Sequence, residues 1–192
     1  MNNSEIRARA RMNLGGSIFH TDWLTALAVC FLASFISGIF PLVLFGPITF
    51  GESMIFLKKA RGGMIEFGDL FCGFDRFGEC FVLAFMQGLF VFLWCLIPIV
   101  GPFIGIAKAL GYGMSFYIKV DNPNMGWREC LDRSMIMMNG HRWEYFCLQF
   151  SFIGWMIVGA LACGLGTLWV MPYLEAAKAN YYEVRRMQGS GF

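Results

Sequence analysis

The chain is short of charged residues, which make up 15% of its 192 positions, against roughly 25% in an ordinary soluble domain. Hydrophobic residues reach 57%, more than a soluble fold of this size buries. The formal net charge of +2 gives no reason to expect a nucleic-acid partner. These proportions predict lipid as the main surroundings, and therefore an integral membrane protein.

Motifs that carry chemistry are also missing. The seven cysteines form no C-x-x-C pair and are odd in number, so neither a zinc site nor a disulfide framework is indicated. A P-loop, a G-x-S-x-G and an H-E-x-x-H are absent. We therefore predict no catalytic residue, no metal site and no cofactor, and we do not expect an enzyme.

Three long apolar blocks dominate what is present. With the charged residues that interrupt each, they are residues 23–57 (Glu52), 80–118 (Lys108) and 145–182 (Glu175 and Lys178). Each block is too long for one membrane crossing of about 20 residues and about right for two. Each also carries helix breakers near its middle, which predict turns: Pro41 with Gly46-Pro47, Pro98 with Gly101-Pro102, and Gly164 with Gly166. The blocks predict an all-α membrane protein with about six transmembrane helices in three hairpins.

The first hairpin is the least regular of the three. Its second span, "PLVLFGPITFGESMIFL", is short and contains two prolines and two glycines. A half-crossing, re-entrant element is the alternative to a full span here. The block lacks the A-x-A pattern of a cleavable signal, so we expect it in the mature protein.

Basic residues predict the orientation in the membrane. Apart from Lys108 and Lys178, Lys and Arg occur in four segments, residues 1–22, 58–79, 119–144 and 183–192, and in none of the three hairpin tips. Loops rich in Lys and Arg stay in the cytoplasm. We therefore expect a cytoplasmic N-terminal segment, two cytoplasmic loops and a cytoplasmic tail within a single polytopic domain, residues 1–192.

Both long cytoplasmic loops contain amphipathic helical patterns. Apolar side chains recur at i, i+3, i+4 or i+7 in each: Phe67, Leu70, Phe71 and Phe74, then Trp127, Leu131, Met135 and Met138. Such helices lie along the membrane surface with the apolar side down. Packing of the same face on a membrane-protein partner is the alternative, and a second copy of the chain is another such partner.

The charges inside the apolar blocks are the best candidates for function. Glu52, Lys108 and Glu175 each fall near mid-membrane in the second helix of a hairpin. A charge at that depth costs roughly 2.5–3.5 kcal/mol unless it is paired. We predict a polar cluster of these three residues, which either lines a cavity for a polar substrate or serves as a structural ion pair. Lys178 lies nearer the cytoplasm, where its ammonium can extend to the headgroups.

Aromatic and cationic residues mark the points where the chain enters the bilayer. His141 and Arg142 lie just before Trp143, where the fifth predicted span begins, and His20 lies before Trp23, where the first begins. Trp prefers the membrane boundary, and cations there contact lipid headgroups. We interpret these five as interface residues, because a metal site needs several converging ligands.

The fourth predicted span carries a row of small residues. Gly101, Gly105, Ala109 and Gly113 recur every four positions. Such rows let helix backbones approach closely in lipid. We predict that this row packs against another helix.

The order of several motifs resembles a bacterial integral-membrane family catalogued as domain of unknown function 975. The motifs are Arg61, "DLFCGF" (69–74), "YIKVDNPNM" (117–125), "SMIMMNGHRWEYFCLQFSFIGW" (134–155) and "GLGTLWVMPYLEAAKANYYE" (164–183). The resemblance implies a multi-pass protein of the bacterial plasma membrane. It implies no activity and no catalytic residues.

Two function classes remain open from the sequence. The first is a non-enzymatic membrane component that binds lipid or a partner protein through its surface helices. The second is a small transporter or channel component that uses Glu52, Lys108 and Glu175. The sequence offers no converging nucleophile, base or metal ligands for an intramembrane enzyme.

Overall fold

The computed structural model describes residues 5–7, 25–30, 32, 41–97, 101–161 and 165–188, and within these ranges the chain is helical without any β-strand. The all-α class is therefore confirmed. The elements are α3 (Pro41–Ala60), η1 (Phe67–Phe71), α4 (Cys72–Asp75), α5 (Phe77–Cys95), α6 (Gly101–Tyr112), α7 (Ser115–Asp121), α8 (Trp127–Met137), α9 (Arg142–Leu161) and α10 (Leu165–Gln188).

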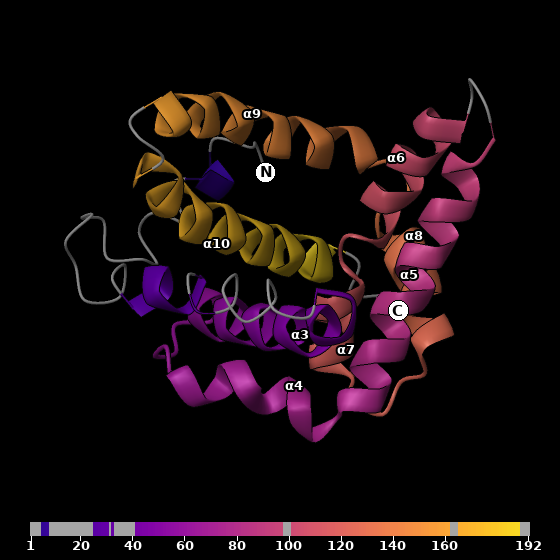
Figure 1. Ribbon diagram of the computed structural model, residues 1–192, viewed down its shortest axis with the longest axis horizontal. Helices are drawn as coiled ribbons and strands as arrows, with labels where there is room; N and C mark the ends of the chain where they lie inside the picture. Colours follow the sequence, from indigo (N-terminus) through magenta and orange to yellow (C-terminus); the bar gives the residue numbers. More distant parts are fainter. Residues whose placement is uncertain are drawn as a thin grey trace.

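Two pairs of helices coincide with the second and third predicted hairpins. Helix α5 ends at Cys95 and α6 begins at Gly101, and the two pack together (Figure 1). Proline is tolerated in the first turn of a helix, where its missing N–H has no partner to lose, so Pro102 suits the start of α6. Helices α9 and α10 form the other pair, and the predicted turn residue Gly164 lies outside the described residues.

The predicted turn at Gly46-Pro47 is wrong, because α3 runs through both residues. Pro41 occupies the first helical position, where proline fits. Gly46 serves close contact instead of a turn: a Cβ there would stand 2.5 Å from the carbonyl oxygen of Cys80. Gly51 is tighter still, with 2.1 Å to the carbonyl oxygen of Leu70. The glycines of α3 therefore let η1 and α5 lie against its backbone.

The fourth predicted span is broken into α6 and α7 at Gly113 and Met114. A side chain of α8 satisfies the backbone groups at this break. The Ser134 hydroxyl donates to the carbonyl of Gly111 (2.7 Å) and accepts from the N–H of Met114 (3.2 Å). Because buried backbone groups need partners, this fully buried serine makes the break tolerable.

Helix α8 does not offer its apolar face to a bilayer, contrary to our expectation. Leu131 and Met138 are 3% and 0% exposed and belong to the main core, against which Trp127 and Met135 also pack. The face is covered by α5, α6 and α7 of the same chain. The other amphipathic pattern folds as η1 and α4: Leu70 is buried, whereas Phe67 and Phe71 remain exposed.

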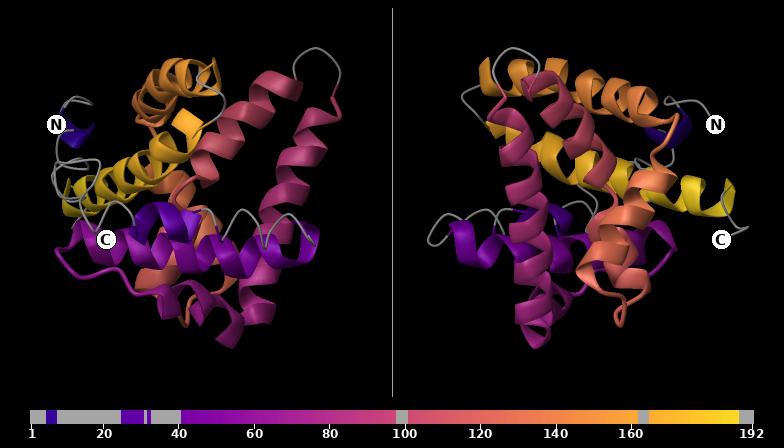
Figure 2. Two further views of the ribbon diagram at one scale, coloured as in Figure 1. Left: turned by 60° about the vertical axis from the view of Figure 1, so that its left-hand side comes forward. Right: turned by 90° about the vertical axis from the view of Figure 1, so that its right-hand side faces the viewer.

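The helices follow two main directions. Helices α3, α9 and α10 run side by side, with α10 between the other two, whereas α5 and α6 cross them steeply (Figures 1 and 2). Helix α10 contacts both α9 and α3. Its C-terminal end lies near the end of α7, and that meeting point positions the candidate site.

Candidate functional site

A cluster of charged side chains joins the ends of α3, α7 and α10. Gly62, with φ of +87°, turns the chain after α3 and leaves Arg61 at the helix end. The Nη2 of Arg61 donates to both carboxylate oxygens of Asp121, at 2.7 and 2.8 Å. Its Nε donates to Oε1 of Glu183 at 2.7 Å. One guanidinium therefore ties α3 to α7 and α10.

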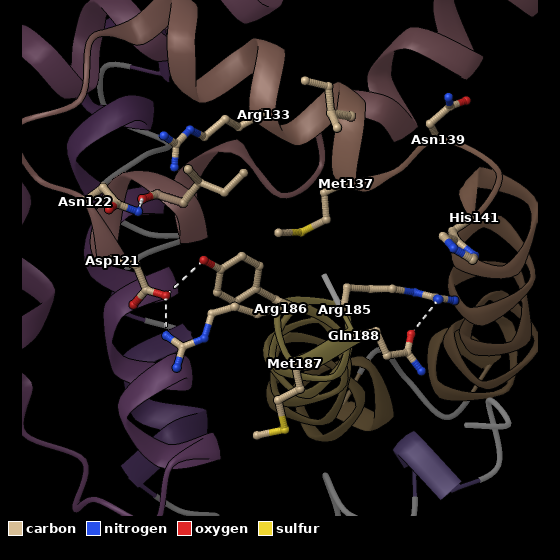
Figure 3. A pocket seen from close by; sticks show the side chains of 13 residues that line it. Asp121, Asn122, Arg133, Met137, Asn139, His141, Arg185, Arg186, Met187 and Gln188 are labelled. Carbon is tan, nitrogen blue, oxygen red and sulfur yellow. Dashed lines mark hydrogen bonds and ion pairs between the residues drawn. The ribbon is translucent and has the colours of Figure 1, made fainter. Parts of the chain in front are cut away.

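Two residues of α10 complete the coordination of Asp121. The Tyr182 hydroxyl donates to Asp121 Oδ2 at 2.9 Å, and Arg186 Nη1 donates to the same oxygen at 2.8 Å (Figure 3). Spaced four apart, both lie on one face of the helix. Burial acts to raise the pKa of Asp121, but hydrogen bonds from Arg186, Arg61 and Tyr182 outweigh it, and the pKa lies below its ordinary value. We call Arg61, Asp121, Tyr182, Glu183 and Arg186 the outer cluster.

Lys119 fixes the loop that follows Asp121. Its side chain is 3% exposed, and its ammonium donates to the carbonyls of Pro123 (2.8 Å) and Met125 (2.7 Å). It also pairs with Glu79 at the start of α5. A buried ammonium needs such compensation on all sides. This residue therefore holds the loop between α7 and α8 against α5.

A cavity of about 1020 Å³ opens beside the outer cluster, between α7, α8, α10 and the start of α9. We call it the α10 groove. Its lining residues are Ile118, Asp121, Asn122, Arg133, Ile136, Met137, Asn139, His141, Tyr182, Arg185, Arg186, Met187 and Gln188 (Figure 3). The wall thus combines three arginines and a histidine with isoleucine and methionine side chains. Such a wall suits an amphiphile with a negative group.

Arg185 is the most enclosed cation of the groove. Its side chain is 10% exposed and lies over the ring of Tyr181, 5.1 Å from the centroid. Its Nη1 donates to Gln188 (2.8 Å) and its Nη2 pairs with Glu144. Its Nε is buried and has no hydrogen-bond partner. A buried donor without an acceptor is costly and calls for an explanation, such as an absent ligand.

The predicted interface residues are not a uniform set. His141 lines the groove, with Nδ1 3.6 Å from Oε1 of Glu144. Arg142 points back to Met135, with 3.7 Å between Nη2 and Sδ. Trp143 is 73% exposed and stacks on Phe146. His20 and Trp23 lie outside the described residues.

The predicted mid-membrane charges are only partly brought together. Glu175 of α10 pairs with Lys178, one turn further along the same helix, at 2.7 Å. Glu52 of α3 interacts electrostatically with both. Lys108 lies elsewhere, over the ring of Trp94 on α5 at 5.6 Å. Lys178, which we expected to extend to the headgroups, is therefore the cation of this group, and we call Glu52, Glu175 and Lys178 the inner cluster.

The small-residue row of α6 meets two different partners. A Cβ at Gly101 would stand 2.4 Å from the carbonyl oxygen of Trp94, and one at Gly105 would stand 2.4 Å from Sγ of Cys95. Gly113 instead faces the ring of Tyr145 on α9 at 2.9 Å. Ala109 is exposed. Close approach therefore holds the α5–α6 pair together at its tip.

Sequence reasoning missed the outer cluster as a unit. It used Arg61 as a family motif and as a marker of orientation, and Arg186 as a marker of orientation. A signal was nevertheless present, because the motifs that carry the family resemblance include Arg61, Asp121, Tyr182 and Glu183. No group of three or more His, Cys, Asp or Glu that could hold a metal occurs in the part of the chain that the structure describes.

Residues 96–188 match the family described as "Protein of unknown function (DUF975)", which confirms the resemblance noted from the sequence motifs. The match covers α6 to α10, and with them the α10 groove and the outer cluster except Arg61. Neither the curated proteins nor the solved structures gave a match to this chain.

Proposed function

We propose that this chain, whose residues 96–188 belong to the DUF975 family, is an integral membrane protein that acts by binding and not by catalysis. The observation that carries the membrane assignment is α5. Among the described helices, it is the one that is long and apolar enough to cross a bilayer. A helix of this kind in the core of a soluble protein would be mostly buried, but only 11% of its apolar window is.

The exposed side chains of α5 fit acyl chains better than water. Phe85, Phe92 and Leu93 are 43%, 63% and 50% exposed. Contiguous apolar surface of this kind is rare on soluble monomers. Burial in lipid stabilises such side chains by roughly 1.5–3 kcal/mol each. A bilayer around α5 therefore accounts for a surface that water would leave unfavourable.

We extend the proposal to a multi-pass protein of the bacterial plasma membrane with six spans in three hairpins. The α5–α6 and α9–α10 pairs support it, because each is a helical hairpin with basic residues only away from the tip. The termini and both long loops then lie in the cytoplasm. Because α5 crosses α3 and α10 steeply (Figure 2), the alternative for α3 and α10 is to lie along the membrane surface.

Fractionation tests the membrane assignment, and labelling tests the topology. We expect the full chain in the membrane pellet after carbonate washing, and recovery in the soluble fraction contradicts the membrane assignment. Single cysteines near residues 100 and 165 in a cysteine-free chain, treated in intact cells with a reagent that does not cross membranes, test the topology of the two helix pairs. Both react if the hairpin tips face outward, and protection of position 165 alone favours surface helices.

Binding is supported by the chemistry of the α10 groove. Its charged groups are held in place by ion pairs, and its wall is part cationic and part apolar. A fixed wall of mixed character selects a ligand by charge and shape. Lipid of the surrounding bilayer and a partner protein are the two ligand classes that we predicted from the sequence.

A small transporter or channel component is the second candidate, and the inner cluster favours it. Glu175 of α10 pairs with Lys178, and Glu52 of α3 interacts electrostatically with both. Ionisable residues inside a membrane mark ion and substrate pathways. If the candidate is right, Glu52→Gln and Glu175→Gln abolish cation or proton flux into liposomes, while Lys108→Met, the matched change outside the cluster, leaves it intact. If the three variants and empty liposomes all give the same flux, the transporter candidate is removed.

A further inference from the structure

We propose that the α10 groove binds the phosphate-bearing headgroup of an anionic phospholipid from the cytoplasmic leaflet. The inference rests on the proposed membrane function and names the ligand of its binding site. It stands on three observations: an enclosed arginine with an unused donor, further cations on the opposite walls, and apolar side chains at the rim.

Arg185 supplies the primary contact. Its guanidinium is almost enclosed, and the buried Nε lacks an acceptor. A phosphate oxygen provides one, because a guanidinium offers two parallel N–H groups that match two phosphate oxygens. Glu144, whose carboxylate pairs with Nη2 of Arg185, is 49% exposed and lies at the mouth of the site. The arginine is therefore held in position by a carboxylate that can move into solvent when a phosphate arrives.

Two further groups face the same space from other helices. His141, at the start of α9, lies toward the tip of Arg185, and Arg133 of α8 lies across the cavity (Figure 3). The His141 Nδ1 is also buried without a hydrogen-bond partner. Arg186, by contrast, is engaged by Asp121, the one acidic residue of the lining. Arg133 pairs with Glu129 of its own helix at 3.2 Å, but both side chains are half exposed, so this ion pair can open to a ligand. Arg185, His141 and Arg133 are therefore the groups that can hold a negative ligand.

The apolar part of the wall points to a lipid and not to a free phosphate. Ile136 and Met187 line the groove and are 57% and 66% exposed. Trp143, two residues after His141, is 73% exposed, and tryptophan prefers the headgroup level of a membrane. A phosphate ion leaves these side chains in water, whereas the glycerol and upper acyl chains of a lipid cover them. Anionic lipids also give the cytoplasmic leaflet its negative surface.

The test measures binding of fluorescent phosphatidylglycerol to the purified full-length chain in mild detergent. We compare Arg185→Gln and Arg133→Gln with Arg128→Gln, an exposed arginine of α8 that lies outside the groove. A basic residue near anionic lipid contributes a factor of about five in affinity, so Arg133→Gln should weaken binding about fivefold and Arg185→Gln more. Arg128→Gln should change it less than about twofold. Equal affinity for all three variants overturns the proposal.

Glu144→Gln separates ligand binding from a structural role of Arg185. If Glu144 competes with the lipid phosphate, its neutralisation strengthens phosphatidylglycerol binding by about threefold, on the scale of a partly exposed ion pair. If Arg185 only serves the fold, the same change weakens binding or leaves it unaltered, and the proposal fails. Thermal unfolding of each variant, measured alongside, shows whether the chain remains folded.

Competition distinguishes the source of the phosphate. Unlabelled phosphatidylglycerol should displace the probe, and phosphatidylcholine, inorganic phosphate and glycerol 3-phosphate should do so at least about tenfold less well. Displacement by inorganic phosphate or glycerol 3-phosphate at equal concentration assigns the groove to a soluble ligand and overturns the lipid proposal. Failure of a membrane-inserted chain to bind the probe overturns this inference alone, whereas a chain that never inserts overturns the proposed membrane function itself.

Discussion

The outer and inner clusters are both built on α10, but their charges balance differently. In the outer cluster, two carboxylates, Asp121 and Glu183, meet two guanidinium groups, those of Arg61 and Arg186. In the inner cluster, two acidic residues, Glu52 and Glu175, are matched by one basic residue, Lys178, which pairs with Glu175. The outer cluster has as many acidic as basic groups, and the inner cluster has one acidic group more than it has basic ones.

This difference separates a structural role from a functional one. A balanced group of charges with several hydrogen bonds fixes the helices that supply it, because removal of any member leaves a counter-charge behind. An ionisable residue without a counter-charge in an apolar helix pair costs stability and is a candidate for function. The following substitutions test whether the two clusters follow this rule, from the largest expected effect to the smallest.

Asp121→Ala should destabilise the chain most. The change leaves two guanidinium groups and the Tyr182 hydroxyl without their shared acceptor. We expect a loss of about 2–3 kcal/mol, below the 3–5 kcal/mol of a fully buried pair because the arginines are partly solvated. Thermal unfolding in detergent measures it, with Asp132→Ala, an exposed carboxylate of α8, as the control. Equal effects of the two changes would show that the outer cluster contributes nothing.

Lys178→Met should cost about 2 kcal/mol, because it leaves Glu52 and Glu175 facing each other without a cation. Adding Glu52→Gln should restore most of the loss, since it removes the repulsion. Lys108→Met is the matched control and should cost at most about 1 kcal/mol, the contribution of a cation over an aromatic ring. A double variant no more stable than Lys178→Met alone contradicts the inner cluster as described.

Ser134→Ala tests whether uncharged groups with several buried hydrogen bonds also stabilise the helices that they join. The change removes the donor to Gly111 and the acceptor for Met114 at the break between α6 and α7. Buried backbone groups without partners should cost about 1–3 kcal/mol. Ser151→Ala is the control, because that hydroxyl only bonds the carbonyl of Leu148 in its own helix. The same unfolding midpoint for both variants would show that the break needs no support.

Lowering the pH should remove the stability that Asp121 contributes to the outer cluster. Because the pKa of Asp121 in the folded chain lies below its unfolded value of about 3.9, its carboxylate adds stability above that pH and loses it as the pH falls through the folded pKa. The unfolding midpoint of Asp121→Asn should therefore lie below that of the original chain at pH 7, and the two should converge as the pH falls through the folded pKa of Asp121. A gap that stays constant across this range contradicts the assignment.

The sequence predicted the helices well because long apolar runs leave few alternatives. Residues 80–118 and 145–182 predicted two hairpins, and the helix pairs α5–α6 and α9–α10 correspond to them. Their outer limits differ, because α5 and α9 begin at Phe77 and Arg142, α6 ends at Tyr112 and α10 runs on to Gln188. The break at Gly113 was missed because its partner, Ser134, lies on another helix. Pattern within one segment cannot show a hydrogen bond supplied by a different one.

The candidate site was less predictable for the same reason. Spacing placed Glu52 and Glu175 at similar depth, and in the structure the two are near enough to interact electrostatically. It did not distinguish Lys108 from Lys178, because the choice depends on which helices are neighbours. The apolar face of α8 was assigned to the bilayer because a periodic pattern identifies a buried face without identifying what covers it.

The position of Arg61 has a consequence for biosynthesis. This residue leaves the ribosome early, yet its acceptors are Asp121 and Glu183, the second of which lies near the end of the last helix. The ion pair that ties α3 to α10 can therefore form only after nearly all of α10 has been made. A chain interrupted before residue 183 keeps Asp121 as the partner of Arg61 but lacks the carboxylate through which this guanidinium also holds α10.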